Sequence, residues 1–170
     1  MTVLRGDGVV LRPLTPEDLE EVRRIRALPE VVKWWGSPEE DFPPDDGDPR
    51  WAVILDGLVV GMIQAYEEPD PDARHADVDV FLDPAHHGRG HGTDAMRTIV
   101  RHLVEDRGHH RITLSTDPAN AGAVRCYEKV GFAPVGITRA SRWDDQAGRW
   151  VDELLMDLVV EPAPPPPAPA

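Results

Sequence analysis

The sequence predicts a single α/β domain built around a mixed sheet. Strand-like and helix-like segments alternate, an Asp56-Gly57 turn joins two apolar runs, and amphipathic segments follow at residues 93–104 and 120–129. Hairpins join antiparallel strands and crossover helices join parallel ones, so the sheet must mix both directions and is not doubly wound. A chain of 170 residues can bury one hydrophobic core. We expect that domain over residues 1–160, followed by a disordered Pro/Ala-rich tail at 161–170.

The N-terminal part combines a strand, two helices and a hairpin. Thr15 offers a capping hydroxyl, Pro16 suits the first helical position, and acids follow in the first turn. Asp-Gly between two apolar runs is the typical signal of a two-residue hairpin turn. The expected elements are a strand at 8–14, helices at 15–28 and 30–34, and hairpin strands at 51–55 and 58–66.

The C-terminal part alternates strands and helices before a closing hairpin. Asp77 and Asp79 alternate with apolar residues, as in a strand with one solvated face. Asn120 is suited to cap a helix and Gly131 to end it. The expected elements are strands at 76–82 and 112–116, helices at 93–104 and 120–129, and hairpin strands at 134–142 and 150–159.

The net charge of the chain is −13, from 31 acidic residues against 18 Lys and Arg. This balance argues against a nucleic-acid-binding module, which needs a basic face, and suits a cationic partner. Fourteen of the acids lie between Glu39 and Asp83, where the basic residues are Arg50 and Arg74. These acids are either a set of solvated loops or an electrostatic funnel for a polycation.

Several classes of site are not expected. Cys126 is the single cysteine, so neither an internal disulfide nor a CxxC metal or redox pair can form. His86, His87 and His91 are not spaced for tetrahedral zinc, and His109 is expected to face solvent with its neighbour. The sequence shows no signal segment and no run of about 20 apolar residues, so we expect a cytoplasmic protein with no metal and no membrane contact.

The strongest functional motif is a glycine-rich turn between a strand and an amphipathic helix. In His87-Gly88-Arg89-Gly90-His91-Gly92-Thr93, three glycines lack Cβ atoms, so successive amides can approach a ligand at the positive end of the helix dipole. That arrangement suits a phosphate or pyrophosphate. There is no Gly-Lys-Ser/Thr ending for a Walker loop, and Thr93 stands where a Rossmann fingerprint needs glycine. The alternative is a plain flexible turn.

Two motifs together resemble the Gcn5-related N-acetyltransferase (GNAT) family. The family's glycine motif is matched by His87–Gly92, with His87 in place of the usual Gln or Arg. Its later signature, Asn followed by a helix ending in Tyr-Glu-Lys-x-Gly-Phe, is matched by Asn120 and Tyr127–Phe132. The resemblance implies a central mixed, mostly antiparallel sheet, splayed at an acetyl-CoA cleft and flanked by about four helices.

The resemblance also implies how acetyl-CoA binds. The coenzyme would lie between the strands at 76–82 and 112–116, with its pyrophosphate on the amides of residues 88–93. Amides near Phe81 and Leu82 would hold the pantetheine arm and polarise the thioester carbonyl. The coenzyme-binding residues implied are Phe81, Leu82, His87, Gly88, Arg89, Gly90, His91, Gly92, Thr93, Asn120 and Tyr127.

Three shorter stretches resemble the aminoglycoside 6′-N-acetyltransferases within this family, namely Trp34-Trp35-Gly36, Thr116-Asp117-Pro118 and Arg125–Lys129. In that subgroup an acid before the glycine turn lies near the reacting amine, and another after the next strand binds the aminocyclitol ring. Asp79 and Asp117 take these places, with Asp77 as the alternative to Asp79.

This resemblance gives the acceptor site and its chemistry. Asp79 would orient the amine and accept its proton, and Tyr127 would protonate the departing thiolate or hold its sulfur. Trp35 is expected to form a wall of the site and Trp34 to lie in the core. The substrate-binding residues implied are Trp35, Asp77, Asp79, Asp117 and Glu67, within a wider acidic cleft of Asp41, Asp45, Asp46, Glu68 and Asp70.

The sequence therefore favours acetyl transfer from acetyl-CoA to the 6′-amine of an aminoglycoside antibiotic, as in resistance enzymes. Two alternatives remain open. One is a GNAT enzyme that acetylates a polyamine, a siderophore amine or a protein N-terminus. The other is a non-catalytic acyl-CoA-binding regulatory protein, which the presence of both Asp79 and Tyr127 disfavours. We expect a monomer or a homodimer.

Overall fold

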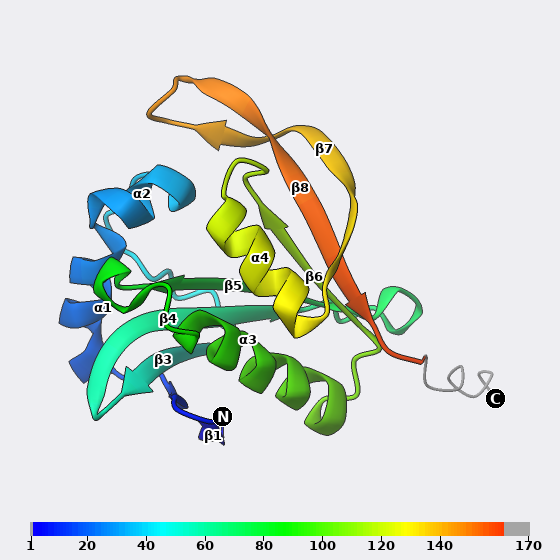
Figure 1. Cartoon of the computed structure of the whole chain (residues 1–170), viewed down its shortest axis with the longest axis horizontal. Coiled ribbons are helices and arrows are strands. Elements are labelled where there is room, and N and C mark those ends of the chain that lie inside the picture. The colour runs from blue at the N-terminus through cyan, green and yellow to red at the C-terminus, as the bar shows by residue number, and fades with distance from the viewer. Residues whose placement is uncertain (1, 162–170) are drawn as a thin grey trace.

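A computed structural model describes residues 2–161, which form one eight-stranded sheet with helices on both faces (Figure 1). The strand order is β1-β2-β3-β4-β5-β6-β8-β7. The strands are β1 (Leu4–Arg5), β2 (Val10–Pro13), β3 (Arg50–Leu55), β4 (Leu58–Glu67), β5 (Ala76–Leu82), β6 (Arg111–Thr116), β7 (Ala133–Asp144) and β8 (Arg149–Val159). The helices are α1 (Leu19–Arg26), α2 (Pro29–Trp35), α3 (His91–Arg101) and α4 (Ala121–Val130). Of the predicted tail, residues 162–170 lie outside the described residues.

The sheet separates two hydrophobic clusters, because successive side chains of a strand point to opposite faces. On one face Met62 and Phe81 pack with Val22 and Ile25 of α1. On the other, Ile63 joins the larger cluster that α3 and α4 cover. Figure 1 shows α1 and α2 at one end of the sheet and α3 and α4 running together across it.

The sheet opens between β5 and β6, which are the one parallel pair among the strands of residues 2–161. β5 pairs with β4 along its whole length, from Gly61↔Leu82 to Glu67↔Ala76. Its pairing with β6 is limited to Ala76↔Ile112 and Asp77↔Thr113, after which the two strands diverge. The predicted mixed, mostly antiparallel sheet with a splay between these strands is confirmed.

The structure differs from the predicted elements at their ends. β1 is only two residues long, too short to leave a periodic signal. A 3₁₀ turn at Pro16–Asp18 precedes α1, where Arg12 and Thr15 bond to the Asp18 carboxylate. The helix predicted at 93–104 begins at His91 and passes into a π-helical turn at His102–Asp106.

The β7–β8 hairpin reaches across the open side of the sheet towards α2 (Figure 1). Near its tip, the Asp145 carboxylate accepts a hydrogen bond of 3.3 Å from the Ser37 amide, just after α2. This contact joins the tip of the hairpin to the segment after α2, on the side of the sheet where β5 and β6 diverge.

Candidate active site

A cavity of about 680 Å³ lies at the splay of the sheet. Its walls come from the end of β5, the glycine turn, the start of α4, the β7–β8 hairpin and α2. This volume is within the range of cofactor and small-molecule sites. The cavity therefore places most of the predicted coenzyme residues, and three of the predicted acceptor acids, around one space.

The glycine turn forms an open cradle at one end of this cavity. Gly88 and Gly90 have φ values of +72° and +88°, and a Cβ atom at either would meet nothing within 4 Å. Gly90 caps α3, so the first amides of the helix, from His91 onwards, have no carbonyl one turn earlier to bond. Free amides at the positive end of a helix fit a pyrophosphate. The turn thus fits the diphosphate of coenzyme A.

The side chains of this turn are not all part of the cradle. His87 lines the cavity, and its Nε2 lies 3.0 Å from the carbonyl oxygen of Leu82, which ties the turn to the end of β5. Arg89 and His91, which we predicted to bind the coenzyme, lie outside the cavity lining. Their neighbours form the cradle through backbone groups, and a pyrophosphate bound to those amides does not require either side chain.

The two predicted amides of β5 point in opposite directions. The Asp83 amide bonds to the Val60 carbonyl across the β4 side. Amides alternate between the two edges of a strand, so the Phe81 amide also faces β4, whereas the Leu82 amide faces the splay. Of the amides predicted near Phe81 and Leu82, that of Leu82 therefore faces the splay, while Phe81 lines the cavity with its ring packed in the cluster of α1.

Helix α4 begins at the cavity and places a buried tyrosine in its wall. The Asn120 side chain accepts a hydrogen bond of 3.2 Å from the Ala123 amide and so caps the helix at the cavity. Tyr127 lines the cavity and is 9% exposed. Burial, and then the neighbouring Cys126 and Asp79, raise the pKa of Tyr127 further above its usual value. Its hydroxyl therefore stays protonated and can donate.

Asp79 lies at the splay, where its side chain is exposed to the open cavity while the surrounding protein desolvates the carboxylate. Burial raises its pKa to about 6, a hydrogen bond of 3.3 Å from Gln64 opposes the rise, and the charges of Asp77 and Glu153 add to it. A carboxylate with this pKa is a better proton acceptor near neutral pH than an ordinary aspartate.

Further acids line the acceptor side of the cavity. Asp77 and Asp117 are both there, and Thr113 donates a hydrogen bond of 2.7 Å to Asp77. Glu30 of α2 and Glu153 of β8 also line the cavity, and neither was predicted. Glu30 and Glu153 lie far from the glycine turn in sequence. The folding of α2 and of the β7–β8 hairpin brings them to the cavity.

The predicted acidic cleft is smaller than expected. Of the acids proposed for it, only Asp77, Asp79 and Asp117 lie among the described lining residues. Asp46 instead pairs with Arg50 at 2.7 Å, and Asp70 caps a short 3₁₀ turn through the Asp72 amide. Asp46 and Asp70 thus contribute to loop structure and not to the cavity.

Two tryptophans of α2 face the cavity. Trp35 packs edge-on against Phe81 at a centroid distance of 5.0 Å and lines the cavity, as expected of a wall. Trp34 also lines it, so the prediction that Trp34 lies in the core is wrong. The short helix presents both aromatic rings beside the acids.

The buried guanidinium of Arg26 holds this aromatic wall. Arg26 is 1% exposed, and it donates hydrogen bonds to the carbonyls of Gly36 at 2.7 Å and Trp35 at 3.1 Å. Its charge lies 5.4 Å from the centre of the Trp35 ring. Burial without a bonded carboxylate lowers the pKa of Arg26.

Replacing Arg26 with alanine is expected to lower the free energy of unfolding by about 2–3 kcal/mol, because several carbonyls lose a charged donor. The KM for the acceptor should rise more than the KM for acetyl-CoA, because the Trp34–Trp35 wall loses its support. Urea unfolding and steady-state kinetics measure the two effects. Glu20→Ala on the exposed side of the same helix is the control, and equal effects of the two variants would contradict the assignment.

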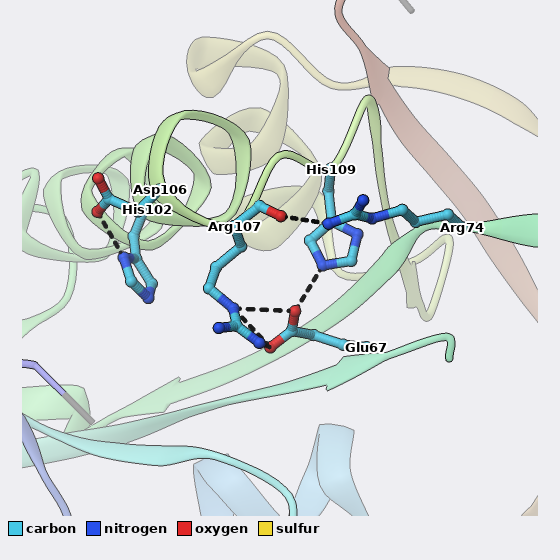
Figure 2. Close-up of polar contacts among 6 residues, drawn as sticks. All are labelled: Glu67, Arg74, His102, Asp106, Arg107 and His109. Atoms are coloured by element: carbon cyan, nitrogen blue, oxygen red, sulfur yellow. Dashed lines mark hydrogen bonds and ion pairs between the residues drawn. The ribbon is translucent and has the colours of Figure 1, made fainter. Parts of the chain in front are cut away.

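Glu67 does not reach the cavity, contrary to the prediction that it binds substrate. Figure 2 shows it instead between Arg107 and His109, and it is the last residue of β4. His109 Nε2 lies 2.6 Å from Glu67 Oε2, and Arg107 lies 3.1 Å from Glu67 Oε1. His109 is 3% exposed, so the expectation that it faces solvent is wrong. Glu67 thus pairs with a buried histidine on one side and an exposed arginine on the other, which compensates its partly buried charge.

Glu67→Gln is expected to lower stability by about 1–3 kcal/mol without changing kcat/KM. Burial alone would raise the pKa of Glu67, but the bonds from His109 and Arg107 hold it below its usual value. The stabilising contribution is therefore present above the ordinary pKa and is lost as the pH falls below about 4. Thermal unfolding across pH, with the exposed Glu20→Gln as control, measures this. A clear fall in kcat/KM would contradict the structural role.

Two further features concern the whole described region. No cluster of three or more His, Cys, Asp or Glu side chains able to hold a metal ion occurs within residues 2–161. Within the same range, every helix is too short or too polar to cross a membrane.

Comparisons with known proteins agree with this site. Residues 14–132 match the acetyltransferase (GNAT) family. The chain is 29% identical over 155 residues to the aminoglycoside N(6')-acetyltransferase type 1 of Klebsiella pneumoniae, which covers 77% of each chain. It is 27% identical over 140 residues to the spermidine N(1)-acetyltransferase of Escherichia coli (strain K12), which covers 76% of this chain and 75% of that one.

The fold comparison gives the same assignment. The structure of AAC(6')-Ib in complex with paromomycin and acetyl-CoA matches with a TM-score of 0.73 at 26% identity, over 90% of this chain and 94% of that one. The family match spans most of the chain and includes the splay and the glycine cradle. The chain therefore belongs to the GNAT family of N-acetyltransferases, has its fold and uses acetyl-CoA as co-substrate.

Proposed function

We propose that the chain acetylates the 6′-amine of an aminoglycoside. The observation that carries this proposal is the acceptor side of the cavity, where several carboxylates lie beside two tryptophan rings. An aminoglycoside carries several positive charges and little apolar surface, so ion pairs and hydrogen bonds must dominate its recognition. The aminoglycoside N(6')-acetyltransferase of Klebsiella pneumoniae supports the same acceptor.

In the proposed reaction the acceptor nitrogen attacks the thioester carbonyl directly. Asp79 orients the amine and accepts the proton that this nitrogen loses as the C–N bond forms. The Leu82 amide faces the splay and can donate to the carbonyl oxygen as negative charge develops on it. Tyr127 gives its proton to the sulfur as the C–S bond breaks, and exchange with water restores both side chains.

A linear polyamine is the second candidate acceptor. The same carboxylates would bind any polycation, and the spermidine N(1)-acetyltransferase of Escherichia coli is similar over three quarters of the chain. The aromatic wall of Trp34 and Trp35 favours a ring over a flexible chain, because flat side chains offer contact area to a sugar ring.

Release of free coenzyme A thiol can separate these acceptors. Neomycin and paromomycin form a matched pair, since paromomycin carries a hydroxyl where neomycin carries the 6′-amine. We expect turnover with neomycin and kanamycin, much less with paromomycin, and a lower kcat/KM with spermidine. Equal turnover of neomycin and paromomycin would exclude the 6′ position. A higher kcat/KM with spermidine would replace the aminoglycoside with a polyamine.

A further inference from the structure

Three polar side chains form a row across the strands that lead to the cavity. Arg50 of β3 lies directly opposite Gln64 of β4, and Gln64 lies directly opposite Asp79 of β5. These three strands are neighbours in the sheet (Figure 1). Arg50 Nε donates to Gln64 Oε1 at 3.1 Å, and Gln64 Nε2 donates to Asp79 Oδ2 at 3.3 Å.

The row fixes which end of the Gln64 amide faces the carboxylate. An arginine has only donors, so the amide oxygen must face Arg50 and the amide nitrogen is left for Asp79. Arg50 is 8% exposed and is itself held in place, because it donates to the Pro44 carbonyl at 2.9 Å and pairs with Asp46 at 2.7 Å. The loop before β3 thus anchors the outer end of the row.

We propose that Gln64 is a positioning residue for Asp79, and that Arg50 and the loop residues that bind it hold the Gln64 amide in its donating orientation. The inference rests on the proposed role of Asp79 as proton acceptor. The proposal also gives a function to the acidic loop before β3, whose acids do not line the cavity. Through Arg50 and Gln64, this loop supports the Asp79 carboxylate.

The surroundings of Asp79 make this donor important. The charged and titratable groups that line the cavity together with Asp79 are Asp77, Glu153, Arg142, Tyr127, Glu30, Asp117, His86, His87, Arg125, Cys126 and Lys129. Of these, Asp77 and Glu153 disfavour the ionised form of Asp79, and the bond from Gln64 favours it. Arg142 is paired with Glu153 at 3.5 Å.

The test is the pH dependence of kcat/KM for whichever amine the wild type acetylates. Gln64→Met keeps the length of the side chain and removes the donor. The acid limb of the profile, where activity rises as Asp79 ionises, should therefore move to higher pH by about half a unit. The shift is modest because 3.3 Å is a long hydrogen bond. Gln64→Glu should move the limb further, since a second carboxylate then faces Asp79. The pKa of the free amine is the same for every variant, so differences report on the enzyme.

The outcomes separate positioning from a merely structural role. A limb that coincides with that of the wild type, or a loss of kcat/KM equal at every pH, in a folded Gln64 variant overturns the proposal. A wild-type profile without a limb near pH 6 overturns the assignment of Asp79, and the proposal with it. If the wild type turns over with an acid limb near pH 6 and Gln64→Met has the same limb, the result counts against Gln64 and leaves the role of Asp79 intact.

Two controls complete the design. Thr113→Val removes the donor to Asp77 instead, and should leave the limb in place. If Thr113→Val moves the limb and Gln64→Met does not, the titrating base is Asp77 and the proposal fails. Arg50→Met should move the limb of the wild type but add nothing to Gln64→Met, because its effect passes through the amide. An equal shift in both backgrounds would remove Arg50 from the row.

Discussion

Replacing Asp79 with asparagine is expected to lower kcat/KM by about 10²–10⁴-fold, the range typical of losing a positioned general base. The amide is nearly the same size, so the cavity and its cradle stay intact and the Kd for acetyl-CoA should change little. The amide can still orient an amine through its oxygen, but it accepts no proton at neutral pH. Steady-state kinetics and calorimetric titration with coenzyme A measure the two quantities.

The matched control for Asp79 is Asp77→Asn, two residues earlier on the same face of β5. The Asp77 carboxylate already accepts a bond from Thr113, so its loss should raise the KM for the acceptor more than it lowers kcat. If Asp77→Asn shows the larger fall in kcat, the proton acceptor is Asp77. Wild-type activity should rise with pH through about 6 as Asp79 ionises, and that rise should vanish in Asp79→Asn.

The raised pKa of Asp79 also predicts how the stability of the protein depends on pH. The pKa of Asp79 is raised from its ordinary value of 3.8 to about 6 in the folded protein. The folded state therefore binds the proton more tightly than the unfolded chain, and its stability falls as the pH rises from about 4 through about 6. Asp79→Asn should be at least as stable as the wild type at pH 7, with the difference shrinking below about pH 4. Loss of stability at pH 7 would contradict this account of the raised pKa.

The sequence predicted those parts of the site that depend on local backbone chemistry. The Asp56-Gly57 hairpin, the Asn120 cap and the glycine turn each need a particular residue at a particular position, and each was placed correctly. The splay between β5 and β6 and the approach of Asp79 and Tyr127 to one cavity also agree with the resemblance to the family.

The errors concern side chains whose partners come from distant segments. Glu67 is held by Arg107 and His109, some 40 residues along the chain, and no local pattern shows that pairing. Glu153 reaches the cavity because the closing hairpin folds back over it. The density of charge along the sequence likewise predicted too many acids in the cleft. It cannot distinguish Asp46, which binds Arg50, from Asp79, which lies in the cavity.

Replacing Gly90 with valine is expected to raise the KM for acetyl-CoA at least about tenfold, the effect of losing a single hydrogen bond to a charged group. At φ +88° a β-branched residue is strained, so the cap of α3 must shift and its amides turn away from the diphosphate. Gly57→Val is the matched control. Gly57 has φ +80° and equally open surroundings, but it lies in the β3–β4 turn outside the cavity. Both variants should lose similar stability, and only Gly90→Val should lose affinity for coenzyme A.

Acetyl-pantetheine distinguishes the cradle from the rest of the coenzyme site. It keeps the thioester and the pantetheine arm but has no diphosphate, so wild-type kcat/KM should already be low and Gly90→Val should lower it little further. With acetyl-CoA the same substitution should remove most of the advantage that the diphosphate gives. An equal proportional loss with both donors would mean that the turn merely shapes the cavity, and that the amides after Gly90 do not bind the diphosphate.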